Sequence, residues 1–127
     1  RLYVSARGSN AVLVFDAEYL VRDPEHALVS TVPVGTAPVG LEITERGQRV
    51  VVADSSRFGG RGGEDLAVID TAKFGQGRAA VIGSIPAGKF PREVHAMADG
   101  QALLLTDYGS DQIELIPVAR LPGSRPK

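Results

Sequence analysis

Short apolar runs rich in valine, isoleucine and leucine recur along the whole 127-residue chain, and glycine, proline, aspartate or serine bounds each run. Runs of this kind are typical of β-strands joined by tight turns. No segment of about a dozen residues keeps a 3.6-residue apolar periodicity without a glycine or a proline, so little helix is expected. The pattern predicts an all-β protein.

The apolar runs belong to an internal repeat. Residues 32–38 return as residues 85–91, and the same offset aligns residues 50–54 with residues 103–107. A further copy begins at residue 2. Once an insertion of about six residues is removed from the middle copy, the period is about 48 residues, which lies in the range of β-propeller blades.

Each period divides into as many as four strands. The predicted first strands of the repeat are 39–44 and 92–97, the second 2–5, 49–54 and 102–107, the third 11–16, 65–70 and 112–117, and the fourth 27–33 and 79–86. The second strands are apolar on both faces, which favours a position between two neighbouring sheets. The strands therefore predict blades packed side by side.

The predicted fold is a β-propeller fragment of about two and a half four-stranded antiparallel blades. The blade parts are 1–33, 39–86 and 92–117, within a partial propeller spanning 1–118. Residues 119–127 contain two prolines and a glycine, and they are predicted to form a disordered C-terminal tail. Strands this few cannot close a ring, so an open blade is expected at each end.

Each open blade is expected to expose an apolar face of about 300–600 Å². At about 25 cal/mol per Å², leaving such a face in water forgoes roughly 8–15 kcal/mol, which equals the net stability of a whole domain. We therefore expect the remaining propeller blades, or other copies of the chain, to cover these faces.

The repeat resembles a known family in its residues. Residues 2–5, 9–10 and 12–16 read Leu-Tyr-Val-Ser, Ser-Asn and Val-Leu-Val-Phe-Asp, and they resemble the YVTN-type β-propeller repeat. Val-Gly at 34–35 and Pro-Val-Gly-Leu at 38–41 are similar to it as well. The resemblance implies the lactonase-like seven-bladed propeller superfamily and a periplasmic or extracellular location. It implies no single function, because such propellers serve as scaffolds, binding proteins and enzymes.

Composition excludes several classes of function. The net charge is −1 and the basic residues are scattered, which argues against a nucleic-acid partner. The apolar runs are too short for a membrane-spanning helix, so no membrane partner is expected. The chain has no cysteine, which rules out disulfides and thiolate metal sites. No cofactor motif is present, and neither a cofactor nor a metal is predicted.

The strongest candidate site lies in residues 90–95, Phe-Pro-Arg-Glu-Val-His. The first strand of a propeller blade lines the central channel, where Arg92 can bind a carboxylate or a phosphate in bidentate fashion. Glu93 and His95 are two residues apart on one strand, so they share a face and can act as an acid–base pair. The alternative is that Arg92 and Glu93 only solvate the channel mouth. The segment resembles the Pro-Arg-His element of lactonase-family propellers, with Glu93 where that family often has histidine.

A second candidate site is the glycine-rich insertion of the middle copy, which contains Arg57 and Arg61. Long loops on repeat scaffolds often lie on the binding face, so the two arginines are candidates for contact with an anion or a partner protein. The alternative is a mobile loop without a ligand. Asp54 and Asp107 recur at one repeat position, which favours an architectural role over a metal site.

Two functions remain open on these residues. The first is a non-catalytic propeller module that binds a small anionic ligand or a protein. The alternative is a lactonase-like enzyme, of the 6-phosphogluconolactonase or muconate-lactonising type, that acts in the central channel through Arg92, Glu93 and His95. No serine has the setting of a catalytic nucleophile, so the sequence leaves catalysis undecided.

Overall fold

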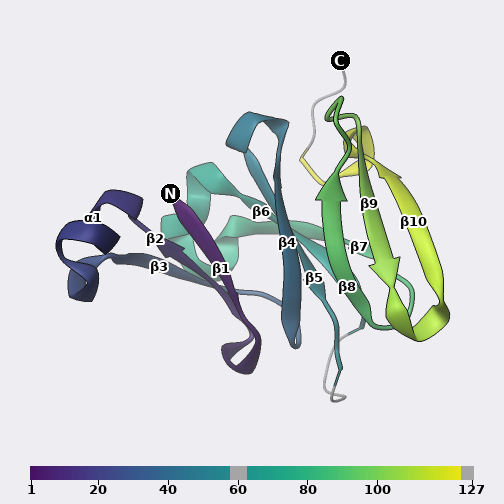
Figure 1. The fold of residues 1–127 in the computed structure, drawn as a ribbon, viewed down its shortest axis with the longest axis horizontal. Coiled ribbons are helices and arrows are strands. Elements are labelled where there is room, and N and C mark those ends of the chain that lie inside the picture. The colour runs from purple at the N-terminus through teal and green to yellow at the C-terminus, as the bar shows by residue number, and fades with distance from the viewer. Residues whose placement is uncertain (58–62, 124–127) are drawn as a thin grey trace.

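The computed structural model describes residues 1–57 and 63–123, and it shows three antiparallel sheets that fan out side by side (Figure 1). The first blade is β1 (Leu2–Ala6), β2 (Ala11–Phe15) and β3 (Leu28–Pro33); the second is β4 (Pro38–Thr44), β5 (Arg49–Asp54), β6 (Asp65–Asp70) and β7 (Val81–Pro86); the third is β8 (Pro91–Ala96), β9 (Ala102–Asp107) and β10 (Gln112–Pro117). The prediction of an all-β propeller fragment is confirmed.

Helical structure is short and lies between strands. The α-helix α1 (Ala17–Arg22) follows β2, and 3₁₀ segments fill several turns, the longest being η4 (Thr71–Ala80) between β6 and β7. The Asp16 carboxylate begins α1 by accepting hydrogen bonds from two backbone N–H groups of the first turn, and this lowers its pKa. No helix of the described residues is long and apolar enough to cross a membrane.

The core lies between blades rather than within one closed shell. For each blade we call the face turned toward the preceding blade its back face, and the other its front face. In β5, Val50 and Val52 on the back face pack against the first blade, whereas Val51 and Ala53 on the front face pack against the third. All four side chains are fully buried. The two-faced apolar pattern of the second strand is thus explained by a neighbour on each side.

The inner strands of neighbouring blades approach each other closely. Strand β4 lies beside both β1 and β8 (Figure 1). A Cβ atom at Gly40 would collide with the backbone of Arg92 and Glu93 on β8, so only glycine fits there. The Glu42 carboxylate then accepts a hydrogen bond from the Ala96 N–H at 2.8 Å, which satisfies a donor on the free edge of β8.

The segment after β10 is ordered as far as residue 123, so the prediction of a disordered tail from residue 119 is wrong for residues 119–123. Residues 118–120 form a 3₁₀ turn, and Leu121 is buried in the core between the second and third blades. Pro122 lies against Gly83 of β7, where a Cβ would come within 2.8 Å of the proline ring. The apolar Leu121 side chain thus anchors the segment despite its proline and glycine content. Residues 124–127 lie outside the described part of the chain.

Candidate functional site

The three predicted site residues on β8 are all exposed to solvent. Val94 is buried against the second blade, whereas Arg92, Glu93 and His95 are exposed. The Glu93 carboxylate and the His95 ring approach to 3.8 Å, so the two pair with each other as their spacing predicts. Both side chains are more than half exposed, and such a pair contributes little to stability.

Arg92 turns to aromatic rings rather than to a carboxylate. Its guanidinium lies 5.6 Å from the ring centre of Phe90 and 5.9 Å from that of Tyr108. The two rings meet edge to face with their centres 5.6 Å apart. Arg57 from the insertion lies 5.7 Å from the same Phe90 ring, so two predicted site residues meet on one aromatic side chain. We call Arg57, Phe90, Arg92 and Tyr108 the arginine–aromatic cluster.

The repeat shows that this cluster is specific to the third blade. The corresponding backbone in the second blade has the same conformation: Ala37 and Phe90 both adopt a φ of 54°. The Ala37 carbonyl oxygen accepts a hydrogen bond from the Ser55 N–H at 3.1 Å, and the Phe90 carbonyl oxygen accepts one from the Tyr108 N–H at 3.0 Å. The side chains at equivalent positions differ in three pairs: Ala37 and Phe90, Val39 and Arg92, and Ser55 and Tyr108. One backbone frame therefore carries small or aliphatic groups in one blade and the arginine–aromatic cluster in the next.

The cluster borders a hollow of about 450 Å³ on the third blade. The hollow is lined by Arg92, Glu93, Thr106, Asp107, Tyr108, Asp111, Gln112 and Ile113. Its lining residues carry one guanidinium, one aromatic ring, the hydroxyl groups of Thr106 and Tyr108, and three carboxyl groups. A surface of this kind suits a polar ligand with both anionic and hydroxyl groups.

Two buried carboxyl pairs recur at the repeat position predicted to be architectural. Asp54 lies directly opposite Asp65 in the β5–β6 ladder, and its Oδ2 accepts a hydrogen bond from the Gly35 N–H at 3.1 Å. Burial, followed by hydrogen bonding to Asp65 and the repulsion of its charge, raises the pKa of Asp54 to about 8. The pair therefore shares a proton at neutral pH.

The third blade repeats this arrangement with a different partner. Asp107 at the end of β9 pairs with Glu114 on β10, and burial followed by Glu114 raises the pKa of Asp107 to about 7. The Gly88 N–H donates to the Glu114 carboxylate at 3.0 Å. Asp107 is 1% exposed, so this group supports the wall of the hollow rather than meeting a ligand directly. The residues that the structure describes contain no metal-binding group of three or more such side chains.

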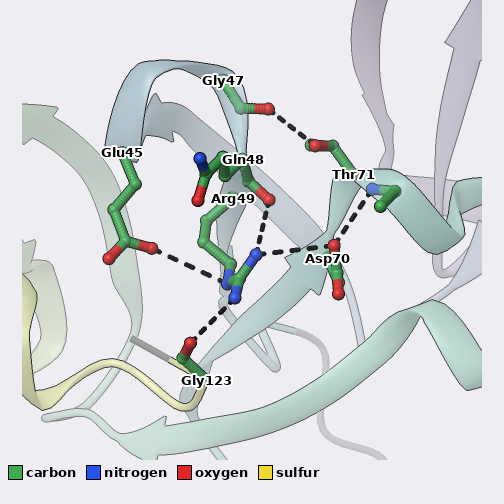
Figure 2. Close-up of polar contacts among 8 residues, drawn as sticks. Glu45, Gly47, Gln48, Arg49, Asp70, Thr71 and Gly123 are labelled. Atoms are coloured by element: carbon green, nitrogen blue, oxygen red, sulfur yellow. Dashed lines mark hydrogen bonds and ion pairs between the residues drawn. The ribbon is translucent and has the colours of Figure 1, made fainter. Parts of the chain in front are cut away.

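A second polar hollow, of about 540 Å³, surrounds Arg49 on the second blade. Figure 2 shows the polar contacts of this arginine. The guanidinium donates to the carbonyl oxygens of Gln48 and Gly123, at 2.9 and 2.8 Å, and forms ion pairs with Glu45 and Asp70, at 3.7 and 3.4 Å. The guanidinium thus holds the C-terminal segment in place, and the two carboxylates beside it already balance its charge, which disfavours a further anion. We therefore place the candidate site in the third blade.

The predicted site residues are thus partly brought together. Arg57 and Arg92 meet at Phe90, Glu93 and His95 pair nearby on β8, and Arg61 lies outside the described residues. Phe90 was part of the predicted segment 90–95 but had no assigned role, and Tyr108 was not predicted as a site residue. A comparison of side chains at equivalent repeat positions would have found both, because each replaces a small residue of the second blade.

The comparisons with known proteins support the fold. No protein-family model matches the sequence, and no curated protein matches it either. Among solved structures, the chain is similar to hydrazine synthase of Kuenenia stuttgartiensis, with a TM-score of 0.72 and 19% identity over 93% of this chain and 29% of that one. The resemblance to the YVTN-type repeat itself stays a prediction.

Two further solved structures are named for lactonases. A "putative 6-phosphogluconolactonase" from Bacteroides uniformis has a TM-score of 0.72 and 17% identity, over 95% of this chain and 34% of that one. Another from Bacteroides fragilis has a TM-score of 0.70 and 14% identity, over 91% and 31%. The chain thus spans about a third of the length of these structures. At such low identity the likeness shows the fold alone, which is that of a β-propeller.

Proposed function

We propose that the chain is a non-catalytic propeller module that binds a small hydroxylated anion in the hollow of the third blade. The observation that carries the proposal is the arginine–aromatic cluster, which is built on a backbone frame that the second blade fills with small and aliphatic side chains. Side chains that recur at the same position of every blade would indicate an architectural role. Arginine, phenylalanine and tyrosine occur at these positions in the third blade but not in the second, which indicates a role beyond building the repeat.

The chemistry of the ligand follows from the groups around the hollow. Within residues 1–57 and 63–123, no carboxylate forms an ion pair with Arg92, so its planar fork is available to a carboxylate or a phosphate. The Tyr108 ring offers a flat apolar surface for the carbon skeleton. Glu93 and Asp111 can accept hydrogen bonds from hydroxyl groups. A sugar acid or a sugar phosphate matches all three features.

Calorimetric titration with D-gluconate and with inorganic phosphate tests the proposal. We expect gluconate to bind, and Arg92→Ala to weaken that binding about tenfold or more, because a charge-assisted bidentate pair is worth at least about 1.4 kcal/mol. Arg22→Ala is the matched control, since Arg22 also stacks on a tyrosine, 5.2 Å from the Tyr19 ring, but lies on α1 away from the hollow. Gluconate binding that is equal in the wild type and in Arg92→Ala would refute the proposal.

The second candidate function is lactone hydrolysis, favoured by the names of two matched structures and by the Glu93–His95 pair beside Arg92. In this alternative the pair would move a proton while Arg92 orients the substrate. The hydrolysis of glucono-δ-lactone above its spontaneous rate, abolished in His95→Ala and Arg92→Ala, would favour the enzyme. A periplasmic or extracellular location is part of either proposal and depends on the sequence resemblance.

A further inference from the structure

A further hollow, of about 440 Å³, lies between the first and second blades. One wall is the connection that leaves the first blade, with Val34 and Gly35, and the other is formed by the outer strands β6 and β7 of the second blade. Both walls belong to the described chain. The hollow is therefore complete whatever covers the exposed faces of the first and third blades.

The second blade has room at this place because one side chain is small. Ala67 on β6 lines the hollow, whereas Glu114 occupies the equivalent position on β10 of the third blade. The Glu114 side chain reaches across to the Gly88 N–H at 3.0 Å. Where the third blade supplies a carboxylate of its own, the second blade has a methyl group beside open space.

One end of the hollow is acidic. It is lined by Asp54, which is 1% exposed, and by Asp65. The Oδ1 atoms of both are buried, and no donor among the described residues gives either a hydrogen bond. Such oxygens need a proton or a cation, and the raised pKa of Asp54 means that the pair keeps a proton at neutral pH. An ammonium group can replace that proton, because it brings the same charge and three N–H donors.

The other end of the hollow is basic. Beyond Asp65 the lining continues with Ala67 and Ser84, which are opposite each other in the β6–β7 ladder, and then with Val81. Arg78, in the last turn of η4 before Val81, lines this end. Its side chain is exposed, and it forms no ion pair within residues 1–57 and 63–123. The acidic and basic ends are thus roughly 10–14 Å apart along the strand.

We propose that this hollow binds an elongated amino acid, with the ammonium group at Asp54 and Asp65 and the carboxylate at Arg78. The methylene chain between the two charged groups lies against Val34 and Val81. Extended 6-aminohexanoate measures about 8 Å between its charged groups, and a hydrogen bond of about 2.8 Å at each end brings the span to roughly 13–14 Å. The site is separate from the hollow of the third blade.

Calorimetric titration with 6-aminohexanoate tests the inference, with hexylamine and hexanoate as probes that carry only one of the two charges. We expect 6-aminohexanoate to bind at least about tenfold more tightly than either probe, because it alone meets both charged ends. Its binding near pH 7 should release the shared proton to the buffer. The apparent enthalpy should therefore change with the ionisation enthalpy of the buffer.

Three variants locate the bound molecule. Arg78→Ala should weaken the binding of 6-aminohexanoate about tenfold and leave that of hexylamine unchanged. Lys73→Ala is the matched control, since Lys73 is an exposed cation of the same η4 segment that does not line the hollow. Ala67→Glu, which copies the third blade, should abolish binding while the variant still unfolds cooperatively.

Three results would overturn the inference. The first is a wild-type chain that does not bind 6-aminohexanoate. The second is equal affinity for 6-aminohexanoate and hexylamine, which would mean that the carboxylate meets no partner. The third is an equal loss of 6-aminohexanoate binding in Arg78→Ala and Lys73→Ala, which would reduce the effect to the net charge of the segment. Because Arg78 is exposed, its variant remains a valid test even if Ala67→Glu does not fold.

Discussion

The second blade and its two neighbours have the same strand pattern but different surroundings. Val50, Val51 and Val52 on β5 are fully buried because a sheet covers each face, whereas β1 and β10 are covered on one side only. The exposed Leu2 and Ile113 are as apolar as their buried counterparts. Burial in this molecule is thus set by the neighbouring blade, and a blade's contribution to stability depends on how many of its faces are covered.

The largest expected effect comes from truncating a buried leucine of the second blade. Leu66→Ala should destabilise the fold by about 2–5 kcal/mol, because it removes apolar contacts and leaves a cavity. Ile113→Ala, at the equivalent position of the third blade, should cost less than about 0.5 kcal/mol in the monomer. Urea unfolding of dilute protein measures both, and similar losses would contradict the comparison between the blades.

The carboxyl pair of the second blade predicts an effect of pH. The raised pKa means that folded Asp54 keeps a proton that the unfolded chain has released above pH 4. The contribution of this group to stability should therefore be greatest at low pH and fall between about pH 4 and pH 8, by up to about 1.4 kcal/mol per pH unit. Asp54→Asn should flatten the fall. The free energy of unfolding should be measured from pH 5 to 8 in both proteins. If it falls equally steeply with pH in Asp54→Asn and in the wild type, the shared proton is excluded.

The close approach of β4 and β8 predicts a smaller loss of stability that is specific to one glycine of β4. Gly40→Ala should destabilise the fold by about 1–3 kcal/mol, because the added methyl group meets backbone atoms of Arg92 and Glu93 that cannot rotate away. Gly75→Ala is the matched control, since a Cβ there meets nothing within 4 Å. Thermal unfolding compares the two variants. A Gly40→Ala variant as stable as the control would mean that the inner strands are farther apart than the structure shows.

The smallest expected effect concerns the contacts by which Arg49 holds the C-terminal segment. Arg49→Ala should cost about 1–2 kcal/mol, because the hydrogen bonds to the Gln48 and Gly123 carbonyl oxygens are lost (Figure 2). It should also make residues 118–123 more accessible to carboxypeptidase than they are in the wild type. Arg46→Ala, on the same hairpin turn, serves as the control. Equal rates of digestion in all three proteins would mean that Arg49 does not hold this segment in place.

Most of the fold could be predicted from the repeat. The strand ranges 49–54, 65–70, 102–107 and 112–117 match the observed strands, because valine- and leucine-rich runs between turn residues leave few alternatives. The ordered segment after residue 117 could not be predicted, because its proline and glycine indicate a turn or a tail equally well. Its order comes from the burial of Leu121 between two blades, which is a tertiary contact without a local signature.

The candidate site was only partly predictable for a similar reason. Arg92, Glu93 and His95 are visible as polar residues on a strand that should line the channel, and their place on β8 follows from the repeat. The contact of Arg57 with Phe90 joins a long insertion to the third blade, and no spacing rule relates the two. The raised pKa of Asp54 likewise depends on burial and on Asp65 across the strand pair.

Native-state hydrogen exchange of the dilute monomer tests the blade arrangement most directly. If both faces of the second blade are covered, the amides of β5 and β6 should exchange most slowly, and those of β1 and β10 much faster. The account predicts this order even though all four strands have similar composition. Equal protection of all four strands, or slower exchange in β10 than in β5, would contradict it.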